Sequence, residues 1–153
     1  MGERKIKNTE ILDANGGKIS TPPKYGQSII LRATTENMLG EVLMLSLWER
    51  DTYSDQGHDK DSNQLLWSGD SEKVNNKGIG EKKIVLSPAM MVAAGKKLFD
   101  GSEHEYYLLV EADKMKTMSA TTQVSNEIML SPGDQKAAKK DPVPENKTSI
   151  TLK

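Results

Sequence analysis

The chain has 153 residues, of which 35% are hydrophobic and 28% are charged, and this length fits a single domain. Its 21 basic and 22 acidic residues leave a net charge of −1, which argues against non-specific nucleic-acid binding. Cysteine is absent, which excludes disulfides, thiol nucleophiles and cysteine-ligated metals. No apolar run reaches the ~18–20 residues of a membrane span, and no secretory signal follows Met1. The composition points away from most enzymes.

Hydrophobicity alternates with a period of two through the middle of the chain, which predicts short antiparallel strands. The expected strands are 27–35, 41–49, 64–68, 80–86, 105–111 and 148–152, with a weaker candidate within 121–130. Both faces of 41–49 are partly apolar, which favours a strand in the centre of a sheet. Trp48 and the Tyr106-Tyr107 pair are expected to anchor the core.

One short helix is expected at about 88–98. Ser87 can cap it, Pro88 suits its first position, and Asp100-Gly101 would end it. An α/β fold would need helices between most strands, and the pattern does not provide them. The predicted fold class is therefore all-β: an Ig-like antiparallel β-sandwich with one short helix and flexible polar termini.

The composition also suggests three parts. Residues 1–16 carry mixed charge and are interpreted as an N-terminal extension. Residues 17–130 contain the strand pattern and form the sandwich. Residues 131–153 are rich in proline, lysine and small residues, which is typical of a linker or arm, and they end in the possible strand.

The acidic region 51–70 is a candidate calcium site. Asp59, Asp61 and Asn63 alternate as in a calcium-binding loop, and Asp70 falls at the twelfth position. Gln64 stands where such a loop needs glycine, and Asp70 replaces the usual bidentate glutamate. A solvated hairpin loop is the alternative interpretation. Calcium is the one cofactor that the sequence suggests.

The two histidines are the next candidates for chemistry. His58 could join Asp55 and Asp59 in a metal site, and a histidine beside a carboxylate can also act in general acid–base catalysis. Neither His58 nor His104 has a partner at a spacing that compels such a site. Both are more simply interpreted as surface residues.

Two further functions remain open. Trp48, Trp67 and Tyr53 could stack against a sugar, which would make the region around the 51–70 loop a carbohydrate site, although core packing is the commoner role of such tryptophans. A hydrolase using Asp55, Asp59 and Asp61 is the weakest hypothesis, because no apolar surroundings are identifiable that would raise one carboxyl pKa. No nucleophile motif or phosphate-binding loop occurs in the sequence.

Four segments, Tyr25–Asn37, Gly40–Glu49, Gly78–Leu86 and His104–Glu111, resemble the immunoglobulin-like β-sandwich modules of Bacteroidetes proteins. Such modules often accompany PAAR-like, peptidoglycan-binding or toxin domains, and some belong to type VI secretion or related contractile injection systems. The resemblance implies a non-enzymatic structural or adaptor module. Its partner would be a protein, such as a spike, tube or effector component of the secretion apparatus.

A protein partner could be bound by strand addition, because a sheet edge presents unpaired backbone groups. Thr148, Ile150 and Leu152 lie on one side of the last expected strand and are the candidate contact residues. This arm could bind in trans or fold back on its own sheet. The alternative is a calcium- or carbohydrate-binding module. The expected location is the cytoplasm, or export without a signal peptide by a contractile system.

Overall fold

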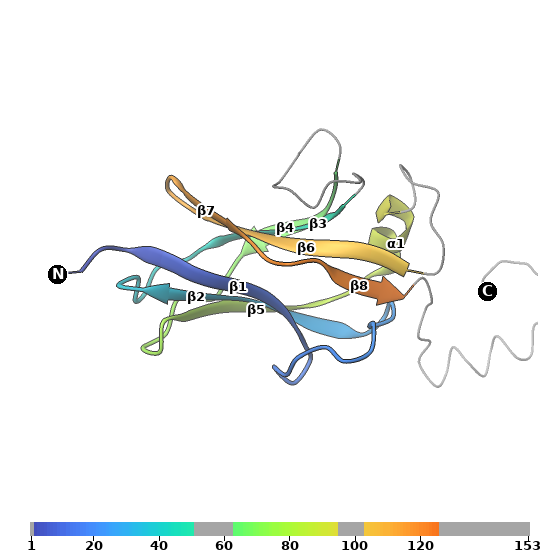
Figure 1. The fold of residues 1–153 in the computed structure, drawn as a ribbon, viewed down its shortest axis with the longest axis horizontal. Coiled ribbons are helices and arrows are strands. Elements are labelled where there is room, and N and C mark those ends of the chain that lie inside the picture. The colour runs from blue at the N-terminus through green and yellow to red at the C-terminus, as the bar shows by residue number, and fades with distance from the viewer. Residues whose placement is uncertain (1, 51–62, 95–102, 126–153) are drawn as a thin grey trace, which may run out of the picture.

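We describe the fold from a computed structural model, which describes residues 2–50, 63–94 and 103–125. Two antiparallel sheets stack on one another, as Figure 1 shows. The first sheet has the order β1-β2-β5, formed by Lys5–Asp13, Ser28–Glu36 and Ile79–Val85. The second has the order β4-β3-β6-β7, formed by Gln64–Asp70, Met44–Glu49, Glu103–Ala112 and Met115–Met118. β8 (Thr122–Ser125) pairs with the first half of β6. The predicted all-β sandwich is confirmed.

Alternation along each strand decides which side chains enter the core. In β2, Ile29, Leu31 and Ala33 are buried and face the second sheet. Leu45 and Leu47 of β3 meet them from the other side, while Met44, which precedes Leu45 and faces the opposite way, is exposed. β3 lies between β4 and β6, so the expected central strand is confirmed.

β6 is buried on both faces. Tyr106, Leu108 and Val110 enter the core between the sheets, whereas Tyr107 and Leu109 face outward and are still almost inaccessible. This double burial matches the continuous apolar run in the sequence, because a strand covered on both sides needs no polar face.

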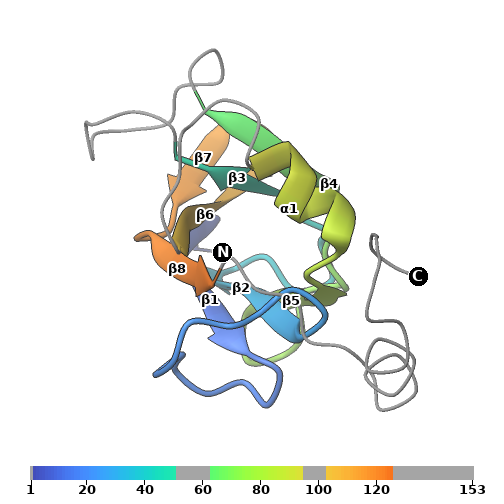
Figure 2. The same ribbon diagram turned by 90° about the vertical axis from the view of Figure 1, so that its right-hand side faces the viewer.

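α1 spans Pro88–Ala94, so the predicted short helix is present, and its expected continuation to 98 extends beyond the described residues. The Met90 amide donates to the Ser87 carbonyl at 3.0 Å and lies 3.3 Å from the Ser87 hydroxyl, as expected of an N-cap. Met90 is buried, and α1 lies beside β4 (Figure 2). In the described part of the chain, no helix is long and apolar enough to cross a membrane.

The placement of residues 1–16 outside the sandwich needs correction, because Lys5–Asp13 form β1 and pair with β2 along its length. Ile6 and Ile11 enter the core, whereas Lys7 is exposed at the surface. A bulge between Ile6 and Asn8 shifts the register of the strand. The mixed charges belong to the solvent-facing side of an edge strand, where charge discourages unwanted pairing.

Trp48 also differs from expectation. It lies on the same face of β3 as Met44, which is the outer face, and is only half-buried. Its indole Nε1 donates a hydrogen bond of 2.8 Å to the Ser46 hydroxyl on that face. Leu43, Leu45 and Leu47 at alternate positions fill the core instead, because they make their side of the strand apolar up to Glu49.

Candidate functional site

A buried polar cluster lies where β6 begins, at the end of the sandwich that carries α1. The Tyr25 hydroxyl lies 2.7 Å from His104 Nδ1 and also hydrogen-bonds the Tyr106 hydroxyl. Tyr25 and Tyr106 are fully buried, and His104 is 3% exposed. We call these three residues the tyrosine–histidine cluster. The prediction that His104 is a surface residue is therefore wrong.

Local backbone structure holds Tyr25 in this position. The Gly26 amide donates to the Leu86 carbonyl at 2.7 Å, and the Leu86 amide donates to the Gln27 carbonyl at 2.9 Å. Gly26 has a φ of 104°, which glycine adopts without strain. The turn that follows Pro22-Pro23 thus ties Tyr25 to the end of β5. On β6, the His104 and Tyr106 rings lie 10° from parallel, as side chains two residues apart on a strand face allow.

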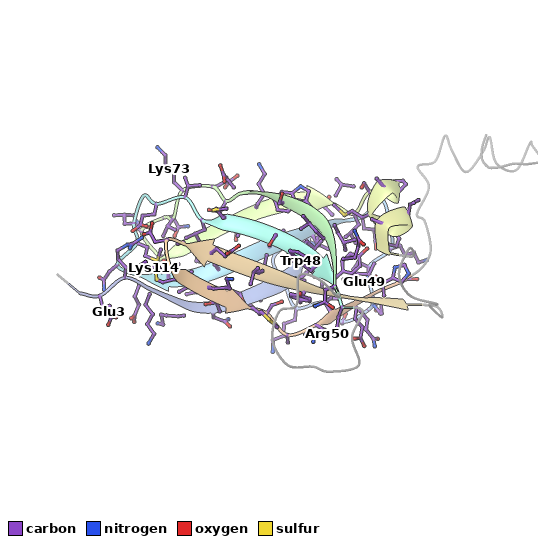
Figure 3. All side chains as sticks on the ribbon, turned by 90° about the horizontal axis from the view of Figure 1, so that it is seen from above. Glu3, Trp48, Glu49, Arg50, Lys73 and Lys114 are labelled. Atoms are coloured by element: carbon purple, nitrogen blue, oxygen red, sulfur yellow. The ribbon has the colours of Figure 1, made fainter. Side chains whose placement is uncertain are left out.

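Glu49 extends this polar region on β3. It is fully buried and pairs across the strands with Tyr106, so it lies at the same end of the core. Figure 3 shows Glu49 with Trp48 and Arg50 at that end of β3. Tyrosine, histidine and glutamate can serve acid–base chemistry, but these side chains are sealed from solvent. Their arrangement suits the fixing of strand positions, because buried hydrogen-bonded groups specify a single packing.

A second polar group lies on the outer face of β6. The Asn63 side-chain amide donates a hydrogen bond of 2.9 Å to the Tyr107 hydroxyl, and both residues are buried. The Arg50 guanidinium lies 5.2 Å from the centre of the Tyr107 ring, within the range of a cation–π interaction. The Arg50 amide donates to the Glu105 carbonyl at 2.8 Å. These contacts attach both flanks of the 51–62 segment to β6.

Of the four predicted calcium ligands, the structure describes Asn63 and Asp70, and it does not bring these two together. Asn63 immediately precedes β4 and binds Tyr107, whereas Asp70 ends the same strand. A strand of this length holds the two side chains about 20 Å apart, so they cannot share one cation. Asp59 and Asp61 lie outside the described residues. Within the described ranges no group of three or more acidic or histidine side chains is arranged to hold a metal.

Several other predicted site residues also lie outside the part of the chain that the structure describes. They are Tyr53, Asp55, His58, Thr148, Ile150 and Leu152. Trp67 of the expected sugar platform is described, and it packs partly buried against the core on the inner side of β4. The side of the Trp67 ring that packs against the core is therefore not available to stack against a sugar.

The outer face of the five-stranded sheet carries an exposed apolar surface. Val42 is 46% exposed, Met44 is 61% exposed and Leu65 is 43% exposed. Leu65 pairs with Trp48 across β3 and β4, and Ser46 and Ser68 lie between this pair and Met44. We call Val42, Met44, Trp48 and Leu65 the outer apolar patch. The alternation of 41–49 already contained this signal, because Val42 and Met44 share the face opposite the core leucines.

Two open hollows flank the segment that leads from β1 to β2. One of about 390 Å³ is lined by Leu12, Lys18 and Thr122 among others, and one of about 490 Å³ by Asp13, Thr21 and Gln27 among others. Both are wide and mixed in polarity. They lack the convergent polar groups that usually mark a small-molecule site.

Comparison with known proteins finds likeness in structure and not in sequence. No protein-family profile matches the chain, and no curated protein is similar to it in sequence. The crystal structure of dimeric latent PorU from Porphyromonas gingivalis is similar, with a TM-score of 0.45 and 17% sequence identity. The similarity covers 97% of this chain and 15% of that chain. The chain thus spans only a small part of that protein's length.

Proposed function

We propose that this protein is a non-enzymatic interaction module that binds a protein partner through the outer apolar patch. The observation that supports this most is the exposure of Met44 and Leu65, at 61% and 43%, on one face of a sheet whose other face forms the core. Exposed apolar side chains gathered on one surface are typical of protein contact sites.

The support beneath the patch is rigid. β3 is hydrogen-bonded on both sides, to β4 and β6, so the patch residues on it are held in a fixed relative arrangement. A preorganised surface loses little conformational entropy on binding, which favours affinity. Ser46 and Ser68 add hydroxyl groups within the patch, as is common where contact surfaces combine apolar and hydrogen-bonding groups.

The particular role that we propose is an adaptor in a type VI secretion or related contractile injection system, with a spike, tube or effector protein as partner. This role is supported by the resemblance of the strand-and-turn segments to Bacteroidetes sandwich modules. It implies that the protein works in the cytoplasm or leaves through the contractile apparatus. The absence of any enzymatic activity is part of the same proposal.

The test is affinity purification of the tagged protein from cells that produce it, read by quantitative mass spectrometry. The test variant combines Met44→Glu and Leu65→Glu, which places charge in the outer apolar patch. The matched control is Leu39→Glu, since Leu39 is 70% exposed in the turn between β2 and β3. We expect the same apparatus proteins with wild type and control, and their loss with the test variant.

Thermal unfolding of all three proteins confirms that each is folded before the captures are compared. Equal recovery of partners by the wild type and the doubly charged variant would show that the patch is not the contact. If the wild type captures proteins unrelated to secretion and the test variant loses them, the interaction role stands. The assignment to a contractile injection system is then overturned.

A further inference from the structure

The second half of β5 is an open sheet edge. The Glu81 carbonyl accepts a hydrogen bond from the Glu72 amide at 2.9 Å, and the Ile79 carbonyl accepts one from the Asn75 amide at 3.0 Å. Odd-numbered residues of β5 therefore direct their backbone groups away from β2. Lys83 and Val85 continue this series. Among the residues that the structure describes, no segment outside β2 donates to or accepts from their backbones.

The path of the chain explains why the edge opens at this point. Residues 72–75 run beside the first half of β5, but the Ser71 amide already donates to the Leu43 carbonyl next to the other sheet. Residues 72–75 therefore turn away from β5 before they reach the backbone of Lys83. α1 lies beside β4 (Figure 2). Lys83 is exposed and Val85 is 54% exposed as a result.

We propose that residues 148–152 of the same chain add to this edge as a further strand beside Lys83 and Val85. The segment Thr-Ser-Ile-Thr-Leu alternates, with Ile150 and Leu152 on one side, and it contains no charge or proline. An alternating strand of this kind pairs through its backbone and selects its register through its side chains. This surface is distinct from the outer apolar patch, so the inference goes beyond the proposed function.

The side chains decide which way the added strand faces. Ile84 points into the core and is 8% exposed, whereas Val85 points to the opposite face and is half-exposed. Apolar surface therefore remains to be buried on the face of Val85. We place Ile150 on that face, where it would cover Val85 as a lateral neighbour.

The distance to be spanned fits the chain. The Ser125 amide donates to the Pro23 carbonyl at 2.9 Å, and Gly26, three residues on, donates to the Leu86 carbonyl. Three residues span at most about 11 Å, so β8 ends within roughly 15–20 Å of the end of β5. A random coil with as many residues as the segment 126–147 has an r.m.s. end-to-end distance of roughly 25 Å, which covers this separation.

This tether also favours the same chain over a second copy. A tether of this length gives a local concentration on the order of millimolar, far above the micromolar concentrations of ordinary experiments. The added strand would also protect this edge from pairing with other chains, in addition to the charge of Lys83.

Disulfide trapping tests the proposal directly, because the natural chain has no cysteine. Val85→Cys is combined in turn with Ile150→Cys and with Ser149→Cys, which have nearly the same tether length but opposite strand faces. We expect rapid intramolecular oxidation of the 85/150 pair and several-fold slower oxidation of the 85/149 pair. Equal rates would show a freely moving tail and overturn the proposal.

Dilution separates the two possible sources of the strand. Oxidation in monomers at all concentrations supports the same chain, whereas disulfide-linked dimers that disappear on dilution would overturn it in favour of a second copy. Amide hydrogen exchange gives an independent measurement. Truncation after Leu130, or Ile150→Pro, should speed exchange at Lys83 and Val85 by at least about tenfold, while Leu31 in β2 stays protected. Unchanged exchange at both edge amides would contradict the added strand.

Discussion

The hydroxyl of Tyr25 lies 2.7 Å from Nδ1 of His104, although the two residues are 79 positions apart in the sequence. This contact ties the loop before β2, in one sheet, to the start of β6 in the other. Tyr106 completes the cluster from β6, since its hydroxyl also bonds that of Tyr25. A polar group in each sheet thus fixes how the sheets lie over one another at the end that carries α1.

Replacing Tyr25 by phenylalanine should lower the free energy of unfolding by about 1–3 kcal/mol, because the variant removes a buried hydroxyl that hydrogen-bonds both His104 and Tyr106 and keeps the ring. Tyr106→Phe is the matched control, since it removes one of these bonds and leaves the Tyr25–His104 contact. It should cost less. Chemical denaturation measures both variants. Equal and negligible losses would show that the cluster contributes nothing to stability.

The contact between Asn63 and Tyr107 should be measurable by a double-mutant cycle. Asn63→Ala, Tyr107→Phe and the double variant remove the 2.9 Å hydrogen bond from either side and then from both. We expect a coupling free energy of about 0.5–1.5 kcal/mol in denaturant unfolding. Additive effects would mean that the bond does not join the start of β4 to β6 in solution. Ser68→Ala with Tyr107→Phe is a suitable control pair and should show additivity.

Most strands could be predicted from the sequence because their information is local. Alternation in 27–35 identified β2 to within one residue, alternation in 41–49 identified β3 with a start three residues too early, and the cap at Ser87 and Pro88 located α1. β1 was missed because charges at Lys5 and Lys7 interrupt its pattern, and only pairing with β2 reveals it.

The site was harder to predict because it depends on contacts between distant segments. The burial of His104 requires Tyr25 from the other sheet, and no local pattern around His104 indicates that partner. The spacing of Asn63 and Asp70 matched a calcium loop, but such a loop curves around its ion, whereas this segment is an extended strand. The outer apolar patch follows from the same alternation that gave the core and could be predicted from it.

Two glycines with the same backbone conformation should differ in their tolerance of alanine. Gly78 has a φ of 83° and Gly40 a φ of 82°, so each alanine costs about 1–2 kcal/mol of backbone strain. A Cβ on Gly78 would also lie 2.5 Å from the Thr35 carbonyl oxygen, whereas a Cβ on Gly40 meets nothing within 4 Å. Gly78→Ala should therefore lower the free energy of unfolding by clearly more than Gly40→Ala. Equal losses in denaturant unfolding would contradict this close approach.

The pairing of Arg4 with Glu41 should give the protein a stabilising contribution that acid removes. The Arg4 guanidinium donates to both Glu41 carboxylate oxygens, at 2.8 and 2.6 Å, and also to Asp113 at 2.7 Å. The hydrogen bonds from Arg4 lower the pKa of Glu41 below its ordinary value of 4.5, against a smaller opposing effect of desolvation. The pKa of Arg4 is raised by the same bonds, so Arg4 stays charged throughout.

A lowered carboxyl pKa in the folded state means that the contribution is complete above the ordinary pKa of glutamate and disappears as the pH falls through the folded-state pKa. Glu41→Gln should thus lower the Tm at pH 7, and the difference from wild type should disappear as the pH falls through the lowered folded-state pKa of Glu41. Because the Arg4 and Glu41 side chains are 41% and 32% exposed, the difference at pH 7 should be small and should shrink in high salt. Glu36→Gln is the control, since Glu36 makes a single 3.4 Å contact with Lys7. A Tm difference for Glu41→Gln that persists unchanged in acid would show that the side chain acts through packing instead of charge.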